Sequence, residues 1–183
     1  MKKVAVLLAD GFEEIEALTV VDLLRRAKVY VDTVSITDDY TVRGAHGIPV
    51  QTEDLITEID FKESDMIVLP GGMPGTTNLK EDENVRKAVQ EAYDDGRYVA
   101  AICAAPTILA DMGLLKGKRA TCYPGMESEI EDAYLTGAPV ATDENIITSQ
   151  GVGTAIDFAL KLIEVLISEE KAVEIADSIV YQR

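Results

Sequence analysis

The sequence is poor in side chains that bind metal ions or form cross-links. Its 183 residues include two cysteines, Cys103 and Cys122, and one histidine, His46. The cysteines form neither a zinc-ligand spacing nor a Cys-x-x-Cys pair, so we expect no metal site and no redox pair. A structural disulfide is not expected either, because the compartment predicted below is a reducing one.

Long hydrophobic runs and positive charge are also scarce. The apolar run at residues 4–8 is too short for a signal peptide, and no segment approaches the roughly 18 apolar residues of a membrane span. A cytoplasmic location is therefore predicted. The net charge of -16 and the pI of about 4.3 repel phosphate backbones and anionic lipids. Neither nucleic acid nor a membrane is therefore a predicted partner.

Strand-like and helical patterns alternate along the chain. Because such a pattern is typical of parallel strands joined by helices, it predicts a single domain over residues 1–183. We expect a three-layer α/β/α sandwich with a mostly parallel, flavodoxin-like sheet. A polar stretch at residues 37–52, which contains His46, predicts a hairpin at the sheet edge. The predicted strands are residues 4–8, 29–36, 66–69, 98–102 and 145–148, and the predicted helices are residues 14–27, 84–93, 104–112, 154–167 and 169–181.

Cys103 is the strongest candidate for a reactive group. It directly follows the apolar strand at 98–102 and precedes two alanines and Pro106, which can open a helix. This order resembles a nucleophile elbow, in which the positive end of the following helix favours a thiolate. The alternative is an inert, buried cysteine, which is the common state of a free thiol in a protein.

Glycines and a glutamate in neighbouring loops strengthen this hypothesis. Gly72 and Gly75 lie in a loop where backbone N–H groups can approach a reacting oxygen, as in an oxyanion hole. The loop lacks the ending of a P-loop, and residues 151–153 lack the third glycine of a dinucleotide site. Glu16 begins an inward-facing stripe of its helix, where burial raises a carboxyl pKa and suits a proton donor or acid/base catalyst.

Four motifs together resemble the ThiJ/PfpI superfamily, in the branch of the parkinsonism-associated protein deglycase and bacterial YajL. They are Asp-Gly-Phe-Glu-Glu-Ile-Glu at 10–16, Leu-Pro-Gly-Gly-Met-Pro-Gly at 69–75, Ala-Ala-Ile-Cys-Ala-Ala-Pro at 100–106 and Thr-Ser-Gln-Gly-Val-Gly-Thr at 148–154. The resemblance implies that Cys103 is an easily oxidised nucleophile and that Glu16 is the protonated glutamate bound to it. It also implies backbone donors at Gly72 and Ala104.

The same resemblance implies a homodimer. Arg26 matches an arginine that helps to line the site across the family's dimer interface, and His46 falls where relatives carry arginine or histidine near the partner's pocket. Two departures are informative. Ala104 replaces the histidine of the protease branch, so a Cys-His dyad is missing. Tyr123 replaces a histidine that some relatives place near the cysteine, which gives Glu16 more weight.

Two functions remain open on the sequence alone. The first is a cofactor-free glyoxalase or protein deglycase, in which Cys103 attacks methylglyoxal, glyoxal or an early protein adduct. The second is an oxidative-stress sensor or redox-regulated chaperone, in which Cys103 is oxidised to a sulfinate. Glutamine amidotransferase chemistry is not expected, because it needs a downstream His-x-Glu. Cys122 is either a second oxidisable thiol or a packing cysteine.

Overall fold

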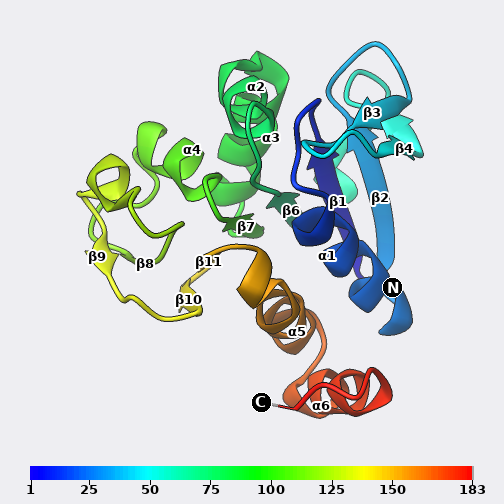
Figure 1. Ribbon diagram of the computed structural model, residues 1–183, viewed down its shortest axis with the longest axis vertical. Helices are drawn as coiled ribbons and strands as arrows, with labels where there is room; N and C mark the ends of the chain where they lie inside the picture. Colours follow the sequence, from blue (N-terminus) through cyan, green and yellow to red (C-terminus); the bar gives the residue numbers. More distant parts are fainter. Residues whose placement is uncertain (183) are drawn as a thin grey trace.

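The computed structural model describes residues 1–182, and a seven-stranded sheet forms its centre (Figure 1). The strand order is β10-β11-β7-β6-β1-β2-β5, and all neighbours run parallel except β10 and β11. The strands are β1 (Lys3–Leu8), β2 (Tyr30–Ser35), β5 (Asp54–Leu55), β6 (Met66–Leu69), β7 (Tyr98–Ile102), β10 (Val140–Asp143) and β11 (Ile146–Ser149). The expected mostly parallel sheet is therefore confirmed.

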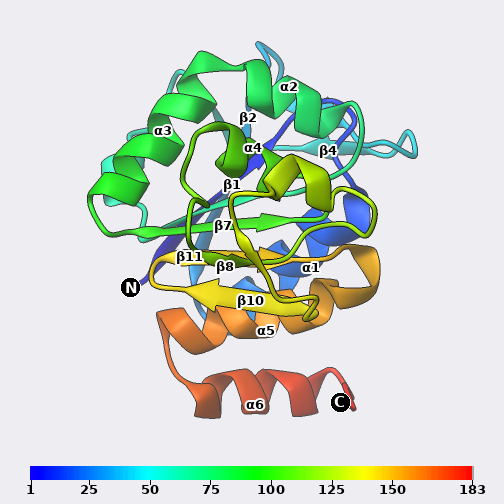
Figure 2. The same ribbon diagram turned by 90° about the vertical axis from the view of Figure 1, so that its left-hand side faces the viewer.

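Helices cover both faces of the sheet (Figures 1 and 2). One face packs against α1 (Glu14–Arg26) and α5 (Ala155–Leu166), and α6 (Glu169–Ser178) lies outside α5. The other face packs against α2 (Gly75–Glu81), α3 (Glu83–Asp94) and α4 (Pro106–Asp111). Three short 3-10 turns complete the helical elements: η1 (Phe61–Glu63), η2 (Glu127–Ile130) and η3 (Val152–Thr154). The three-layer sandwich is confirmed.

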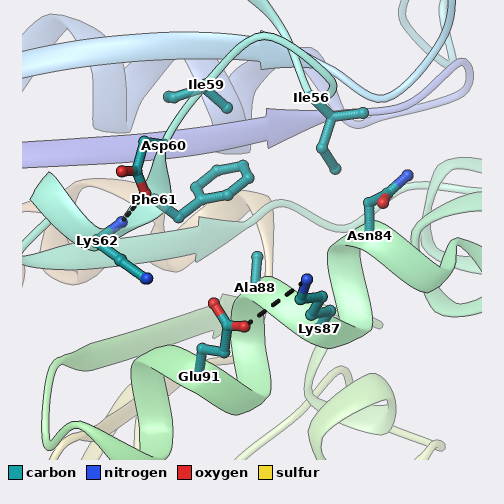
Figure 3. A pocket seen from close by; sticks show the side chains of 9 residues that line it. All are labelled: Ile56, Ile59, Asp60, Phe61, Lys62, Asn84, Lys87, Ala88 and Glu91. Carbon is teal, nitrogen blue, oxygen red and sulfur yellow. Dashed lines mark hydrogen bonds and ion pairs between the residues drawn. The ribbon is translucent and has the colours of Figure 1, made fainter.

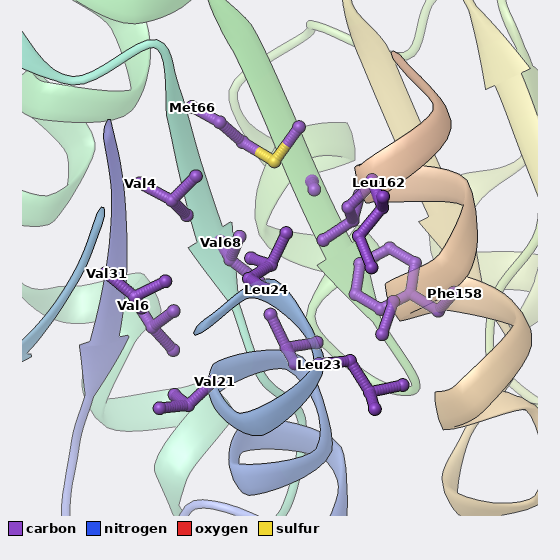
Figure 4. Close-up of a cluster of buried hydrophobic side chains, with 14 of the residues drawn as sticks. Val4, Val6, Val21, Leu23, Leu24, Val31, Met66, Val68, Phe158 and Leu162 are labelled. Carbon is purple, nitrogen blue, oxygen red and sulfur yellow. The ribbon is translucent and has the colours of Figure 1, made fainter. Parts of the chain in front are cut away.

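Successive side chains of each strand point to opposite faces of the sheet, and this divides the hydrophobic core into two clusters. Val4 and Val6 of β1 point toward Leu24 of α1 and Phe158 of α5, as the close-up of this cluster shows (Figure 4). Leu7 points to the opposite face, into the cluster beneath α3 and α4. Because successive strand residues face opposite sides, a continuous apolar strand feeds both clusters. The sheet is thus buried on both faces, which holds the loops at its carboxyl edge in fixed positions.

The structure differs from the sequence-based expectations at several short elements. The helix after Cys103 begins at Pro106 rather than at residue 104, because the two alanines form the turn that leaves the strand. Helix α2 and the strands β5 and β10 were not expected. These elements are short or half-polar, so they carry little periodic signal. Two small separate sheets, β3 (Thr41–Arg43) with β4 (Pro49–Gln51) and β8 (Arg119–Ala120) with β9 (Tyr134–Leu135), complete the fold.

The hairpin that carries His46 has the expected form but a different place. Strands β3 and β4 pair antiparallel to each other and are not part of the main sheet. The hairpin folds over the loop after β1 instead: Gly11 N–H donates to the Arg43 carbonyl at 2.8 Å, and Ala45 N–H donates to the Phe12 carbonyl at 2.8 Å. It therefore covers the loop that leads into α1.

None of the helices within residues 1–182 combines the length and apolar character needed to cross a bilayer.

Candidate active site at Cys103

Cys103 stands on a strained turn at the carboxyl end of β7. Its φ of 66° lies in the left-handed region, which side chains other than glycine rarely adopt. Its N–H donates to the Ser149 carbonyl at 2.9 Å, and its carbonyl accepts the Tyr123 N–H at 2.8 Å. The thiol is partly exposed. These contacts from two other segments hold the turn, and the nucleophile-elbow geometry is present as the sequence predicts.

Glu16 lies on the first turn of α1 and is fully buried. Its Oε2 accepts the Gly71 N–H at 2.9 Å, which ties the carboxyl to the loop after β6. Its Oε1 has no hydrogen-bond partner among the described residues, and the carboxyl lies close enough to the Cys103 thiol for each group to shift the pKa of the other. The structure thus brings the two residues of the predicted proton pair into contact.

Burial is the main influence on the protonation of Glu16. It raises the pKa of Glu16 from its ordinary 4.5 to about 7, while the hydrogen bonds with Cys103 and Gly71 lower the pKa and the charge of Glu13 raises it. Protonated and ionised Glu16 therefore coexist near neutral pH. The carboxyl can both take up and release a proton at this pH, which is the property required of an acid/base catalyst.

The expected thiolate is not what the site favours at rest. Burial, followed by the charge and hydrogen bond of Glu16, raises the pKa of the Cys103 thiol to about 12. Helix α4 starts three residues later and has one and a half turns, so its end offsets little of this desolvation. Of the three causes that raise this pKa, burial is the largest and the other two come from Glu16. Protonation of Glu16 removes its negative charge, so the state of this carboxyl influences the charge of Cys103.

Backbone N–H groups influence the sulfur at two of the three predicted positions. Those of Gly72 and Ala104 lower the pKa of the Cys103 thiol. Gly75 is different, because its N–H donates to the Gly11 carbonyl at 3.2 Å. A Cβ at Gly75 would lie 2.6 Å from the Phe12 nitrogen, so this glycine serves close packing between loops rather than an oxyanion hole.

Gly71 is a site residue that the sequence reasoning missed. A Cβ at Gly71 would lie 2.6 Å from the Cys103 Cβ and 2.7 Å from Glu16 Oε2. Its missing side chain is therefore what allows the thiol and the carboxyl to meet. The Gly-Gly pair at 71–72 was a visible signal, but only the structure shows that the two glycines have separate roles.

Gly71→Ala is expected to disturb both partners of the proton pair. The added methyl group must displace Cys103 or Glu16, and a misplacement of about 1 Å in a catalytic group lowers activity about 100-fold. Overpacking of this kind also costs about 1–3 kcal/mol of unfolding free energy. Aldehyde turnover and urea unfolding of the variant measure the two effects. Gly153→Ala is the matched control, because a Cβ there meets nothing within 4 Å; equal activity of Gly71→Ala and Gly153→Ala contradicts the assignment.

The raised pKa of Glu16 has a consequence for stability. The pKa of Glu16 is higher in the folded protein than its ordinary 4.5. Its contribution to the free energy of unfolding is therefore fully present below about pH 4.5 and is lost as pH rises through about 7. The shift corresponds to about 3 kcal/mol. Urea unfolding of wild type and Glu16→Gln from about pH 4 to about pH 8 isolates this contribution. Parallel pH profiles for the two proteins contradict it.

The mouth of the site is formed by Tyr123 and Gly151. Tyr123 is half-exposed, and a Cβ at Gly151 would lie 3.4 Å from the Tyr123 ring and 3.8 Å from Glu16 Oε1. No histidine occupies this side of the site. Cys122 next to Tyr123 is buried in the cluster beneath α3 and α4, and burial raises the pKa of its thiol to about 11. Its surroundings favour the packing role over the oxidisable one.

Arg26 and His46 lie outside this constellation within one chain. Arg26 ends α1, about 15 Å along the helix axis from Glu16, and it pairs with Asp22 at 2.9 Å. The His46 Nδ1 lies 2.8 Å from Glu14 Oε2. Their predicted contribution to a neighbouring subunit's site therefore stays a prediction.

A separate hollow of about 260 Å³ lies between η1 and α3 (Figure 3). Figure 3 shows Phe61 and Ile56 above Ala88, with charged side chains around them. None of its lining residues belongs to the loops around Cys103 and Glu16, so the hollow plays no part in the chemistry of that site. The lining residues are Ile56, Ile59, Asp60, Phe61, Lys62, Asn84, Lys87, Ala88 and Glu91.

Comparison with known proteins identifies the family. The model of the DJ-1/PfpI family matches residues 2–165. This chain belongs to the DJ-1/PfpI family. The match covers the Cys103 elbow, Glu16 and the backbone N–H groups of Gly72 and Ala104, so the site lies entirely inside the family's region. The expected ThiJ/PfpI resemblance is confirmed at family level.

Individual relatives of the DJ-1/PfpI family cover almost all of the chain. Protein DJ-1 homolog B of Arabidopsis thaliana is 40% identical over 98% of this chain, which spans only 41% of that relative. Glutathione-independent glyoxalase DJ-1 of Schizosaccharomyces pombe is 34% identical over 93% of this chain and 94% of its own length. The solved structure of oxidized Toxoplasma gondii DJ-1 superimposes with a TM-score of 0.95, at 36% identity and full coverage of both chains.

Proposed function

We propose that this protein is a cofactor-free, cysteine-dependent glyoxalase or protein deglycase that acts on methylglyoxal, glyoxal or their early protein adducts. The observation that carries the proposal is the contact between the Cys103 thiol and the buried Glu16 carboxyl, whose pKa is about 7. A nucleophile and a group that exchanges protons near neutral pH are the two parts that this reaction needs.

The reaction begins with addition of the thiol to the aldehyde. The Cys103 sulfur bonds to the aldehyde carbon while ionised Glu16 accepts the thiol proton, and the resulting alkoxide then takes that proton from Glu16. The product is a hemithioacetal. The N–H groups of Gly72 and Ala104 lower the pKa of the thiol, so they stabilise negative charge beside it.

Glu16 then moves a proton between neighbouring carbons. It removes the hydrogen from the former aldehyde carbon and returns a proton to the adjacent ketone carbon, while the proton of the hemithioacetal hydroxyl passes to the former ketone oxygen. The hemithioacetal is thereby converted into a thioester of lactate. Water hydrolyses the thioester, releases lactate and restores the thiol. The reaction consumes no oxidant, reductant or glutathione. With glyoxal, the same steps give glycolate.

Two further observations support this assignment. The relative from Schizosaccharomyces pombe is named a glutathione-independent glyoxalase. In this chain His46 is bonded to Glu14, which leaves Cys103 without the histidine base that a cysteine protease or amidotransferase uses. Both observations favour aldehyde chemistry over peptide or amide hydrolysis.

The direct test is lactate formation by the purified protein. Methylglyoxal is supplied without glutathione or added metal, and proton NMR follows loss of the aldehyde and appearance of lactate. Stoichiometric lactate over many turnovers is the expected result. Consumption of methylglyoxal without lactate, as in simple adduct formation on lysines and arginines, overturns the proposal.

A redox-sensing or chaperone function is the second candidate. It is favoured by the same two N–H groups, because donors that face the sulfur also stabilise an anionic sulfinate. The solved structure of the Toxoplasma gondii relative is described as oxidized. Intact mass after mild peroxide treatment tests it: addition of two oxygens to wild type, and none to Cys103→Ala, is expected. Absence of that increment in wild type removes the candidate.

The assembly and location proposed here rest on the family resemblance. A homodimer would place Arg26 and His46 near the partner's pocket, and the half-exposed Leu18 gives the α1 face apolar surface for such an interface. A cytoplasmic location is part of the proposal, because a reducing compartment would keep Cys103 the free thiol that this chemistry needs. Light scattering of the purified chain tests the dimer, and a monomer mass at micromolar concentration contradicts it.

A further inference from the structure

A second cluster of polar side chains lies at the start of α1, and the chemistry proposed for Cys103 does not use it. It consists of Glu13, Glu14 and His46, whose potential ligand atoms all lie within 4.8 Å of one another. Glu13 and Glu14 are both buried. His46 comes from the hairpin, 32 positions away from Glu14 along the chain. The cluster therefore exists only in the folded protein.

Each carboxylate has one oxygen fixed by a backbone donor and one oxygen directed at the imidazole. Glu16 N–H donates to Glu13 Oε2 at 2.7 Å, and His46 N–H donates to Glu14 Oε1 at 2.7 Å. Glu13 Oε1 and Glu14 Oε2 lie 3.9 Å and 2.8 Å from His46 Nδ1. Outer hydrogen bonds of this kind orient the ligands of metal sites.

Glu13 Oε1 is the least satisfied atom of the cluster. The Glu13 side chain is only 10% exposed, and within residues 1–182 this oxygen faces the imidazole without accepting a hydrogen bond. Glu14 is also tightly enclosed, because the bare backbone of Gly44 packs against its carboxyl. Two nearly buried carboxylates thus face one imidazole, which leaves a local excess of negative charge. That excess outweighs the partial positive charge of about 0.5 at the helix start.

Two of the three distances between the ligand atoms lie close to those around a small divalent ion, and all three are within 4.8 Å. Bonds of about 2.0–2.2 Å to nitrogen and oxygen place the ligands of a tetrahedral ion about 3.3–3.5 Å apart. The observed 2.8 Å and 3.9 Å lie on either side of that value. The His46 side chain is 70% exposed, so it can adjust its position, and solvent can supply the remaining ligand.

From these contacts the geometry points to a binding site for one divalent transition-metal ion, such as Zn²⁺ or Co²⁺, held by Glu13, Glu14 and His46. An imidazole with carboxylates suits these ions better than Mg²⁺ or Ca²⁺, which prefer oxygen ligands alone. On binding, the proton between His46 Nδ1 and Glu14 Oε2 leaves to solvent. The ion would fasten the hairpin to the start of α1, next to the catalytic pair.

The test uses the untagged full chain and Co²⁺ as the probe. Titration by calorimetry and visible absorption is expected to give one Co²⁺ per chain, displaced by Zn²⁺ and retained in excess Mg²⁺. His46→Gln is expected to weaken Co²⁺ binding at least about 10-fold. Because His46 is mostly exposed, this variant is expected to fold normally, which circular dichroism verifies. Glu131→Gln, at an exposed acidic residue of another loop, is the control and is expected to bind like wild type.

Three results overturn the site. They are no stoichiometric binding above that of the acidic surface, equal affinity in wild type and His46→Gln, or loss of the Co²⁺ signal in Cys103→Ala. The last result would place the ion on the thiol. Because the readout is binding rather than turnover, the outcome is independent of whether the protein is a glyoxalase.

Discussion

Cys103→Ala is expected to lower kcat/KM for lactate formation from methylglyoxal by at least about 1,000-fold, because no other group can form the hemithioacetal. Cys122 cannot replace it, since that thiol is buried beneath α3 and α4. The remaining activity should approach the rate of the uncatalysed reaction. Proton NMR measures it directly, since lactate and methylglyoxal have separate signals.

The matched control is Cys122→Ala, which removes the other thiol of the chain. This variant is expected to keep near wild-type turnover, with a modest loss of stability from the vacated volume. Circular dichroism must show that both variants are folded. Wild-type lactate formation by Cys103→Ala, or loss of turnover only in Cys122→Ala, would exclude Cys103 as the nucleophile.

Glu16→Gln is expected to lower kcat by about 100- to 10,000-fold, the range that a positioned acid/base catalyst contributes. Glutamine has nearly the same shape, and its amide oxygen can keep the hydrogen bond from Gly71 at the position of Oε2. It can neither accept the thiol proton nor return a proton to carbon. The loss therefore reports proton transfer rather than packing.

The pH profile separates this role from a structural one. Ionised Glu16 is the base, so wild-type kcat/KM is expected to rise as pH passes through about 7, the pKa of this carboxyl. The residual activity of Glu16→Gln is expected to lack that rise. Peroxide oxidation of Cys103 in the same variant is a second readout, because sulfinate formation needs no transfer between carbons. Unchanged turnover in Glu16→Gln would remove the catalytic assignment.

Proton transfer from the Cys103 thiol to the Glu16 carboxyl explains why a buried thiol can still react. At rest, burial, together with the charge of Glu16 where that carboxyl is ionised, keeps Cys103 protonated. When Glu16 has taken up the thiol proton, its repulsion of a thiolate is replaced by a hydrogen bond donated to the sulfur. Deprotonation of the thiol and protonation of the carboxyl are therefore one coupled event.

The sequence by itself determined the architecture and the position of the reactive loop. Apolar strands bounded by turn residues and helical stripes are local patterns, so the sandwich and the strand that precedes Cys103 could be predicted from neighbours along the chain. The same holds for the elbow, whose alanines and proline are adjacent to the thiol. Short elements such as β10 and α2 escaped prediction because they carry too few residues to show a period.

Only the tertiary structure decided which groups meet and in which protonation state. The bond between Glu16 and Gly71 joins residues 55 positions apart, and the cluster of Glu13, Glu14 and His46 joins two elements that no periodic pattern relates. The helix start beside Cys103 suggested a thiolate, yet burial and a neighbouring carboxyl prevail. Such outcomes depend on distances and desolvation, which arise only when the loops are packed together.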